Sequence, residues 1–280
     1  MDKKYIYRKH LREPSKYLGA LFLFFLIVYI IFSLAIFFSN RVTVEEIIIL
    51  LIGGIAVILI VGLEYIILYF TVFKRFKIIN VSLTEEGIVY KNLKKDIRIK
   101  YSDIIKLKFP SIKYTGGWIK IVYNGGSIRL TVVLENIGDF LKSLKEKLDE
   151  EDMGHVYNEK AMYNFYKTAE FSDQSWARLY EYSKKIAIFI LCNIFIAFIA
   201  IIIKSNLEYT IILFAISIMC PLITFIIAEI IIGRVIAKKA KREEFFVPHR
   251  DKLYELKVYK LAFGIYSIIY LIILALMGLR

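Results

Sequence analysis

Long apolar runs alternate with charged stretches along the chain, and five of these runs are long enough to cross a bilayer. A helix needs about 20 apolar residues to cross a ~30 Å hydrocarbon core. Inside lipid, each backbone N–H and C=O must be paired within its own segment, so these runs are predicted to be helices despite their many β-branched residues. The predicted spans are residues 17–38, 47–73, 186–203, 209–232 and 261–279.

A different pattern occupies residues 74–150, where apolar side chains recur at every second position, as is typical of half-buried strands. Asn124-Gly125-Gly126 predicts a tight hairpin, because glycine accepts the positive φ that such turns require. The apolar spacing then changes to three and four over residues 137–148, which predicts one amphipathic helix. The alternating positions are Ile88 and Tyr90; Ile97, Ile99 and Tyr101; Ile105, Leu107 and Phe109; Ile119, Ile121 and Tyr123; and Ile128, Leu130, Val132 and Leu134.

Three phrases of this region resemble the bacterial pleckstrin-homology-like (PH-like) domain, which occurs beside transmembrane helices in many bacterial membrane proteins. They are VSLTEEGIVYKN at 81–92, IRIKYSDIIKLKF at 97–109 and GGSIRLTVVLENIGDFLKSLKEKL at 125–148. The resemblance implies a bent, seven-stranded antiparallel sheet closed at one end by the helix. The alternating pattern accounts for one strand fewer, and residues 110–117 are the place for a short irregular one. The family brings no catalytic residues.

Residues 151–185 are predicted to form a linker followed by an aromatic helix. An acidic run, residues 149–152, overlaps the start of the segment, and residues 173–185 have helical spacing with Trp176 and Tyr180 on one face. Trp and Tyr prefer the depth of the membrane interface, so this helix either lies there before the span at 186–203 or packs against the strand domain.

Positive charge is concentrated in alternate segments between the spans. Residues 1–16 carry six Lys or Arg and two acids, residues 74–185 carry 21 and 15, and residues 233–260 carry nine and four. The short segments 39–46 and 204–208 have no positive excess. This alternation is the positive-inside bias rather than a nucleic-acid footprint. It predicts a multi-pass protein of the cell membrane with a cytoplasmic N-terminus and no nucleic-acid partner; the C-terminus is outside unless the last run fails to cross.

Basic residues occupy outward positions of the predicted strands. Either they form a face held against anionic lipid headgroups, or they are an ordinary solvated strand face on which Lys also blocks edge pairing. The second interpretation is favoured, because the 15 acids of residues 74–185 dilute any attraction. The candidate headgroup-facing residues are Arg98, Lys100, Lys106, Lys108, Lys120 and Arg129.

Three polar residues lie within the predicted spans: Glu64, Asn193 and Glu229. Charged groups are costly in lipid and are often functional there. The three either converge in an intramembrane polar cluster, as a proton or cation site would, or serve separately. In the second case Asn193 and a neutral Glu64 form interhelical hydrogen bonds, and Glu229 reaches the surface.

Motifs that would indicate an enzyme are absent from the sequence. Cys192 and Cys220 both lie in apolar runs and offer neither a disulfide framework nor metal spacing. No phosphate-binding loop, zinc-protease helix or nucleophile elbow occurs. No catalytic, cofactor-binding or metal-binding residues are therefore predicted.

The fold class expected is a polytopic α-helical membrane protein with an inserted cytoplasmic, PH-like antiparallel β domain. The favoured functional hypothesis is a non-enzymatic bacterial protein that docks a protein partner, a second copy of itself or lipid headgroups at the inner membrane surface. Its role would be in regulation, the envelope or assembly. Transport, alone or as a partner subunit, is the second hypothesis and rests on the polar cluster. An intramembrane enzyme is the third.

Overall fold

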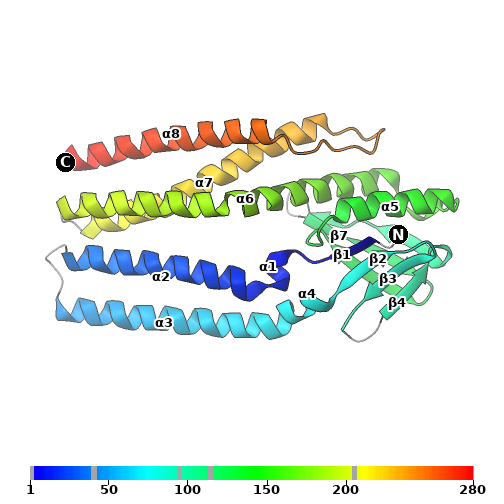
Figure 1. Ribbon diagram of the computed structural model, residues 1–280, viewed down its shortest axis with the longest axis horizontal. Helices are drawn as coiled ribbons and strands as arrows, with labels where there is room; N and C mark the ends of the chain where they lie inside the picture. The colour runs from blue at the N-terminus through cyan, green and yellow to red at the C-terminus, as the bar shows by residue number, and fades with distance from the viewer. Residues whose placement is uncertain (1–2, 39–42, 94–95, 113–115, 204–206, 280) are drawn as a thin grey trace. The chain divides into compact units, whose positions relative to one another are not determined.

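The computed structural model describes residues 3–38, 43–93, 96–112, 116–203 and 207–279, and the chain divides into two compact units (Figure 1). Both units are discontinuous in sequence. The first, the β unit, consists of Met1–Pro14, Leu68–Ala177 and Val235–His249. The second, the membrane unit, consists of Ser15–Ile67, Arg178–Arg234 and Arg250–Arg280.

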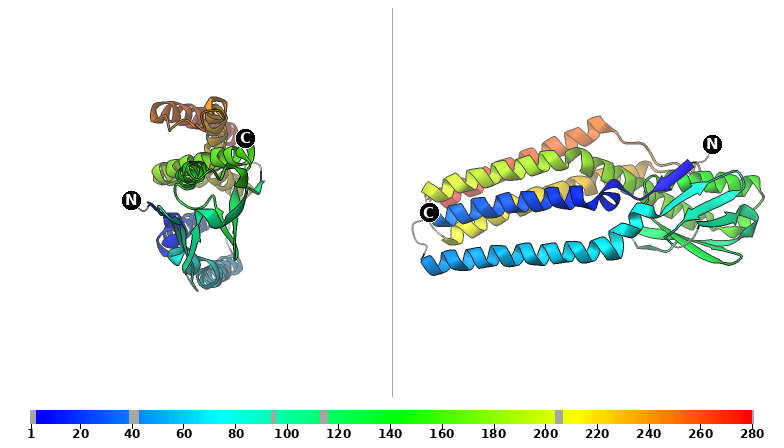
Figure 2. Two further views of the ribbon diagram at one scale, coloured as in Figure 1. Left: turned by 90° about the vertical axis from the view of Figure 1, so that its right-hand side faces the viewer. Right: turned by 60° about the horizontal axis from the view of Figure 1, so that its bottom comes forward.

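The five long apolar helices predicted from the sequence are confirmed. Figure 2 shows them running alongside one another within the membrane unit. Large apolar side chains cover their outer faces and are exposed, as a surface in contact with lipid tails requires. The helices are α2 (Pro14–Phe38), α3 (Val44–Leu68), α6 (Glu159–Ile203), α7 (Leu207–Lys239) and α8 (Lys252–Leu279).

The helices are longer than the apolar runs at several ends. The helix expected over residues 173–185 is present and runs on into the apolar span, but it begins earlier than expected, because α6 is continuous over 45 residues and takes up most of the predicted linker. No glycine or proline interrupts this stretch, so nothing breaks the helix before it enters the apolar run. The loop expected over 233–260 shrinks to residues 240–251. The loops expected at 39–46 and 204–208 lie largely outside the described residues.

The β unit contains two antiparallel sheets. In the first the strand order is β1-β2-β3-β4, and in the second β7 pairs with β5, β6 and β8. The helix α5 (Ile137–Glu150) follows the last strand, as predicted, and buries its apolar face completely. The strands are β1 (Lys3–Ile6), β2 (Asn80–Leu83), β3 (Gly87–Lys91), β4 (Asp96–Lys100), β5 (Ile104–Lys108), β6 (Ser111–Ile112), β7 (Gly116–Tyr123) and β8 (Gly126–Thr131).

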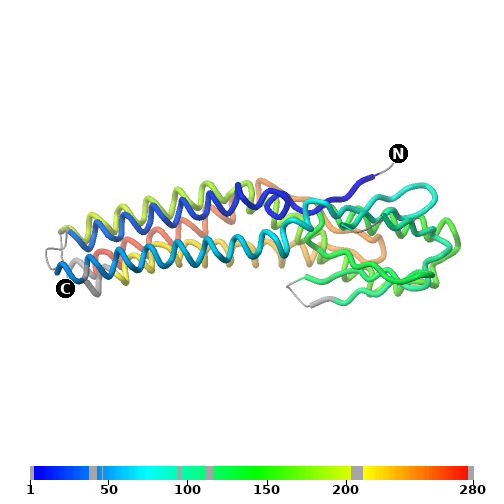
Figure 3. Tube along the Cα trace, turned by 90° about the horizontal axis from the view of Figure 1, so that it is seen from below, coloured from blue at the N-terminus to red at the C-terminus, as the bar shows by residue number. Residues whose placement is uncertain are grey.

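The strand β1 was not predicted, because its four residues were assigned to a basic leading segment. It pairs with β2 in antiparallel register, from Lys3 opposite Leu83 to Ile6 opposite Asn80. The chain therefore leaves the sheet, runs out along α2 and back along α3, and returns to the neighbouring strand of the same sheet (Figure 3). The segment after β1 also closes on the end of the second sheet through an isolated bridge between Tyr7 and Leu134.

The core of the β unit largely follows the alternating pattern, with an inversion at residues 104 and 105. Ile104 is 2% exposed, whereas Ile105, which the alternation placed inside, is 56% exposed. The cause is a shift of register between β5 and β7 at residues 104–106, a β-bulge that inverts the side chains locally. The hairpin at residues 124–126 is confirmed, with Tyr123 opposite Gly126 and Gly125 at φ +116°.

Tyr5 ties β1 to α5. Its side chain is 4% exposed, its ring meets the ring of Phe140 edge-on at 5.3 Å, and its hydroxyl donates to Asp139 Oδ2 at 2.7 Å. Burial and, second to it, the hydrogen bond with Asp139 raise the pKa of Tyr5, so this hydroxyl stays a neutral donor at physiological pH. The N-terminal strand thus contributes a core residue as well as hydrogen bonds.

We predict that Tyr5→Ala destabilises the β unit by about 3–5 kcal/mol, because it removes a buried aromatic ring. Tyr5→Phe, which loses only the hydrogen bond, is expected to cost about 0.5–1.5 kcal/mol. Limited proteolysis of the full chain in detergent over a temperature series measures both. Lys4→Ala, a change at an exposed position of the same strand, is the control. Equal protease resistance of all three variants would show that β1 does not support the fold.

Candidate functional site

Glu64 lies at the edge of the apolar span rather than deep within it. Its neighbour Tyr65 shares a 2.7 Å hydrogen bond with Ser15, which stands in the first turn of α2. Glu64 is therefore level with the polar start of α2, where Lys16 precedes the apolar run. Its side chain is exposed and forms no hydrogen bond or ion pair with another described residue.

Asn193 belongs to a buried hydrogen-bonded layer that joins α6, α7 and α8. Its Nδ2 donates to the Tyr266 hydroxyl at 3.1 Å, and its backbone carbonyl accepts from the Tyr270 hydroxyl at 2.9 Å. The same Tyr270 oxygen lies 2.7 Å from Ser217 Oγ. Such bonds hold transmembrane helices together with about 0.6–2 kcal/mol each. The layer matches the interpretation of Asn193 as an interhelical hydrogen-bonding residue.

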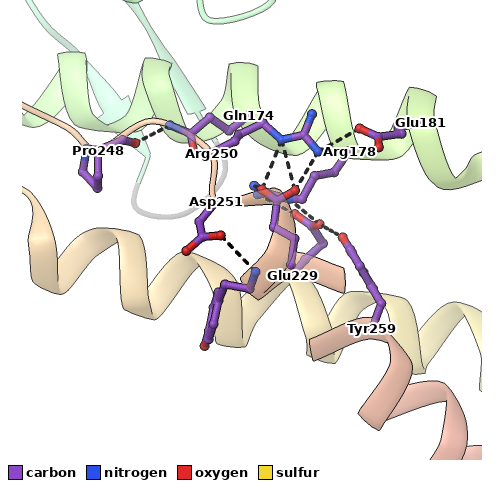
Figure 4. Close-up of polar contacts among 10 residues, drawn as sticks. Gln174, Arg178, Glu181, Glu229, Pro248, Arg250, Asp251 and Tyr259 are labelled. Atoms are coloured by element: carbon purple, nitrogen blue, oxygen red, sulfur yellow. Dashed lines mark hydrogen bonds and ion pairs between the residues drawn. The ribbon is translucent and has the colours of Figure 1, made fainter. Parts of the chain in front are cut away.

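Glu229 takes part in a different cluster, which Figure 4 shows. The guanidinium of Arg178 on α6 donates to both of its carboxylate oxygens, with Nε to Oε1 at 2.7 Å and Nη2 to Oε2 at 2.9 Å. The Tyr259 hydroxyl on α8 also donates to Oε1. This two-pronged geometry is the strong form of a charge-assisted hydrogen bond. Arg178 itself is fully buried.

The same network continues onto α8 and the loop before it. Arg178 Nη1 donates to Glu255 Oε1 at 3.0 Å, and Arg250 Nη2 donates to Glu255 Oε2 at 2.7 Å. Arg250 Nη2 also reaches Glu181 Oε2 at 3.0 Å. The hydrogen bond with Glu255 raises the pKa of Arg250, so this guanidinium stays charged. We call the set Arg178, Glu181, Glu229, Arg250, Glu255 and Tyr259 the arginine–glutamate network.

The network stands near the edge of the apolar spans, because the ring of Tyr180, two residues after Arg178, lies 5.9 Å from that of Tyr17 at the start of the apolar run of α2. Asn193 is 15 residues further along α6, about 22 Å at helical rise. The structure therefore does not bring Glu64, Asn193 and Glu229 together in one cluster. The transport hypothesis loses the arrangement on which it rested.

Chemically, the arginine–glutamate network is suited to joining helices. Every carboxylate in it accepts from at least one guanidinium, so each buried charge has a counter-charge. Within the described part of the chain, no group of three or more His, Cys, Asp or Glu has the arrangement of a metal site.

The six candidate headgroup-facing residues are divided between the two sheets. Arg98 and Lys100 lie on β4, at the edge of the first sheet. The other four belong to the second sheet, where Lys108 is paired in register with Lys120, and Lys120 with Arg129. Lys106, two residues before Lys108, is exposed as well. We call Lys106, Lys108, Lys120 and Arg129 the basic row.

No protein-family model matches the chain, and neither a curated protein nor a solved structure matches it. The candidate sites therefore rest on the geometry of this chain alone.

Sequence reasoning missed Arg178, Arg250, Glu255 and Tyr259. Arg178 stands among aromatic residues, and its two carboxylate partners are 51 and 77 residues away. No local spacing in the sequence therefore indicates these ion pairs. The only available signal was Glu229, an acid within an apolar run that needed a cation on another helix.

We predict that Arg178→Gln destabilises the membrane unit by about 3–5 kcal/mol, because it leaves Glu229 without a guanidinium partner in a largely buried site. Thermal unfolding of the purified chain in detergent measures this. Lys184→Gln, an exposed change on the same helix, is expected to have almost no effect. A second variant, Arg178→Gln with Glu229→Gln, should recover part of the loss. If Arg178→Gln and Lys184→Gln shift the transition alike, the network does not stabilise the unit.

Proposed function

We propose that this chain is a non-enzymatic docking protein of the bacterial cell membrane. Its β unit binds a protein partner or lipid headgroups at the inner surface, in a regulatory, envelope or assembly role. The observation that carries the proposal is that separate chain segments, divided by pairs of membrane helices, assemble one β unit. The bilayer thereby holds a folded binding module at one of its faces.

The pairing of β1 with β2 supports this arrangement, because adjacent strands of one sheet must lie on the same side of a bilayer. Only α2 and α3, an even number of spans, separate them. The same argument applies to α6 and α7, because residues 240–249, which follow α7, contact residues of the β unit that precede the apolar run of α6. The ring of Phe245 stacks on Tyr166 at 4.6 Å, and Gln174 Nε2 donates to the Pro248 carbonyl at 2.8 Å.

The charge pattern favours the cytoplasm as that side. The segments that assemble the β unit come from the three regions with the large excess of Lys and Arg, and such regions stay inside. The pair α2–α3 and the pair α6–α7 each return the chain to the side of the β unit, so α8 is a fifth span that carries the C-terminus to the opposite side.

The layout of the β unit also favours a PH-like module. The resemblance implies one bent antiparallel sheet closed by a helix; the β unit has antiparallel strands in two sheets and a helix after the last strand, and this shared order supports the proposal. The unit has eight described strands, one more than the seven that the resemblance implies: β6 lies within residues 110–117, where a short irregular strand is expected, and β1 is the additional one. Modules of this kind recognise ligands rather than transform them, so the proposal assigns binding and no reaction.

We predict one sidedness for three positions of the β unit. Single cysteines at Lys4, Asn124 and Glu243, in a chain with Cys192 and Cys220 replaced by Ala, should all be labelled only after the inner face is made accessible. A C-terminal reporter should be found on the outer face. A membrane-impermeant thiol reagent applied to intact cells and to inverted vesicles makes the comparison. Labelling of Asn124→Cys and Glu243→Cys from opposite sides would contradict the shared β unit.

The docking function itself is tested by purifying the tagged full chain from native membranes and identifying the proteins and lipids retained with it. Tyr5→Ala, which is expected to destabilise the β unit, should lose the retained species, and Lys4→Ala should keep them. Retention that is identical in all three, or no enrichment over an unrelated five-span protein, would refute the proposal.

A further inference from the structure

Charge is sharply segregated within the β unit. Residues 104–134, which include β5, β7 and β8, contain five Lys or Arg and no Asp or Glu. The next eighteen residues, 135–152, contain seven acids and three Lys. The acids of this region therefore do not dilute the basic row, because they lie on α5 and its flanks instead of on the strands. Lys113, the fifth basic residue, lies outside the described residues.

The basic row places like charges directly opposite one another. Lys120 stands between Lys108 on β5 and Arg129 on β8, and neighbouring strands are about 4.8 Å apart. Like charges in opposed positions of a sheet are destabilising. Among the described residues, none forms an ion pair with Lys106, Lys108, Lys120 or Arg129.

Several basic residues elsewhere in the same unit do form ion pairs. Lys3 lies 3.1 Å from Asp139, Arg8 lies 2.6 Å from Asp173, and Arg12 lies 3.6 Å from Glu135. The unit has carboxylates available, yet it keeps them away from the outer face of the second sheet. Within the described chain, the basic row therefore lacks a counter-charge, which an anionic ligand would supply.

Apolar side chains accompany the row. Trp118 lies two residues before Lys120 on β7 and is partly exposed, and Ile105 next to Lys106 is 56% exposed. Cations beside an exposed aromatic and an exposed aliphatic side chain are typical of surfaces that bind the membrane interface.

We propose that the outer face of β5, β7 and β8 binds the phosphate groups of anionic lipids through Lys106, Lys108, Lys120 and Arg129. This inference rests on the proposed docking function and names its ligand. The bilayer is favoured over an acidic protein because the unit is tethered to it closely. Only Ile79 separates the helix α4 (Lys74–Ile78), which continues from α3, from β2, and seven residues separate β1 from α2. A short tether keeps headgroups at a high effective concentration.

The experiment uses the full chain in nanodiscs of phosphatidylcholine, immobilised and exposed to vesicles of phosphatidylcholine alone or with phosphatidylglycerol. The wild type should bind only the anionic vesicles, and added salt should weaken binding. The basic-row variant combines Lys108→Gln, Lys120→Gln and Arg129→Gln. It should bind the anionic vesicles about a hundredfold more weakly, since each basic residue near an anionic surface contributes roughly fivefold to the affinity.

The matched control removes the same number of charges from the other sheet: Lys91→Gln with Arg98→Gln and Lys100→Gln. It should retain most of the binding. Equal loss in the two triple variants, or equal binding of neutral and anionic vesicles, would overturn the proposal.

Thermal unfolding of the β unit provides a second measurement that does not depend on added vesicles. Anionic nanodiscs should raise the unfolding temperature of the wild type relative to neutral ones, and the basic-row variant should lose this difference. In neutral nanodiscs, Lys120→Gln should itself raise the unfolding temperature, because it removes both repulsions in the row. An unfolding temperature that is independent of lipid charge in the wild type would count against lipid binding.

Failure here is distinguishable from failure of the docking function. If vesicles do not bind but an acidic protein is retained from native membranes by the wild type and not by the basic-row variant, the lipid assignment is wrong and docking stands. If neither is bound, both proposals fall.

Discussion

The antiparallel pairing of β1 with β2 is the constraint on which the rest of the chain depends. It joins residues 3–6 to residues 80–83 across two complete membrane helices, so the sheet can form only after the hairpin has inserted with both ends on one side. Closing so long a loop is entropically costly, and insertion of the hairpin meets much of that cost by bringing its two ends together. The strand unit is therefore coupled to the bilayer by its topology.

The bilayer also determines where the charges of the membrane unit can lie. Arg178 and its carboxylate partners occur level with the start of the apolar run of α2, whereas the layer around Asn193, deeper along α6, is made only of neutral hydrogen-bonding groups. A buried ion pair is tolerable where every charge has a hydrogen-bonded counter-charge, and uncharged hydroxyl and amide groups are cheaper at depth. These relative costs explain why the charged groups lie near the edge of the spans and the neutral hydrogen-bonding groups lie deeper along α6.

Periodicity predicted the five spans, most of the strands and the closing helix, because each depends on side chains that are near in sequence. Most of the failures involve distant partners. β1 is only four residues long and gains its stability from β2 and from Phe140, which nothing within the segment indicates. Ile105 is exposed because of a bulge set by the register with β7. Glu229 stands out in the sequence as an acid among apolar residues, but nothing near it in sequence indicates Arg178, 51 residues away, as its partner.

The four residues of the basic row are among the six candidates that the sequence offers, but a count over residues 74–185 averages acids and bases and so favours a solvated face. The register of β5, β7 and β8 shows that the acids lie elsewhere and that Lys108, Lys120 and Arg129 face one another without carboxylates on their strands. Lysine can discourage pairing at the edge of a sheet, but Lys120 cannot have this role, because β7 is the central strand of its sheet. Edge protection therefore does not explain why Lys120 lies opposite two other basic residues. An anionic ligand would relieve this repulsion. The opposed basic residues that weaken the free sheet would then stabilise the sheet with its ligand bound.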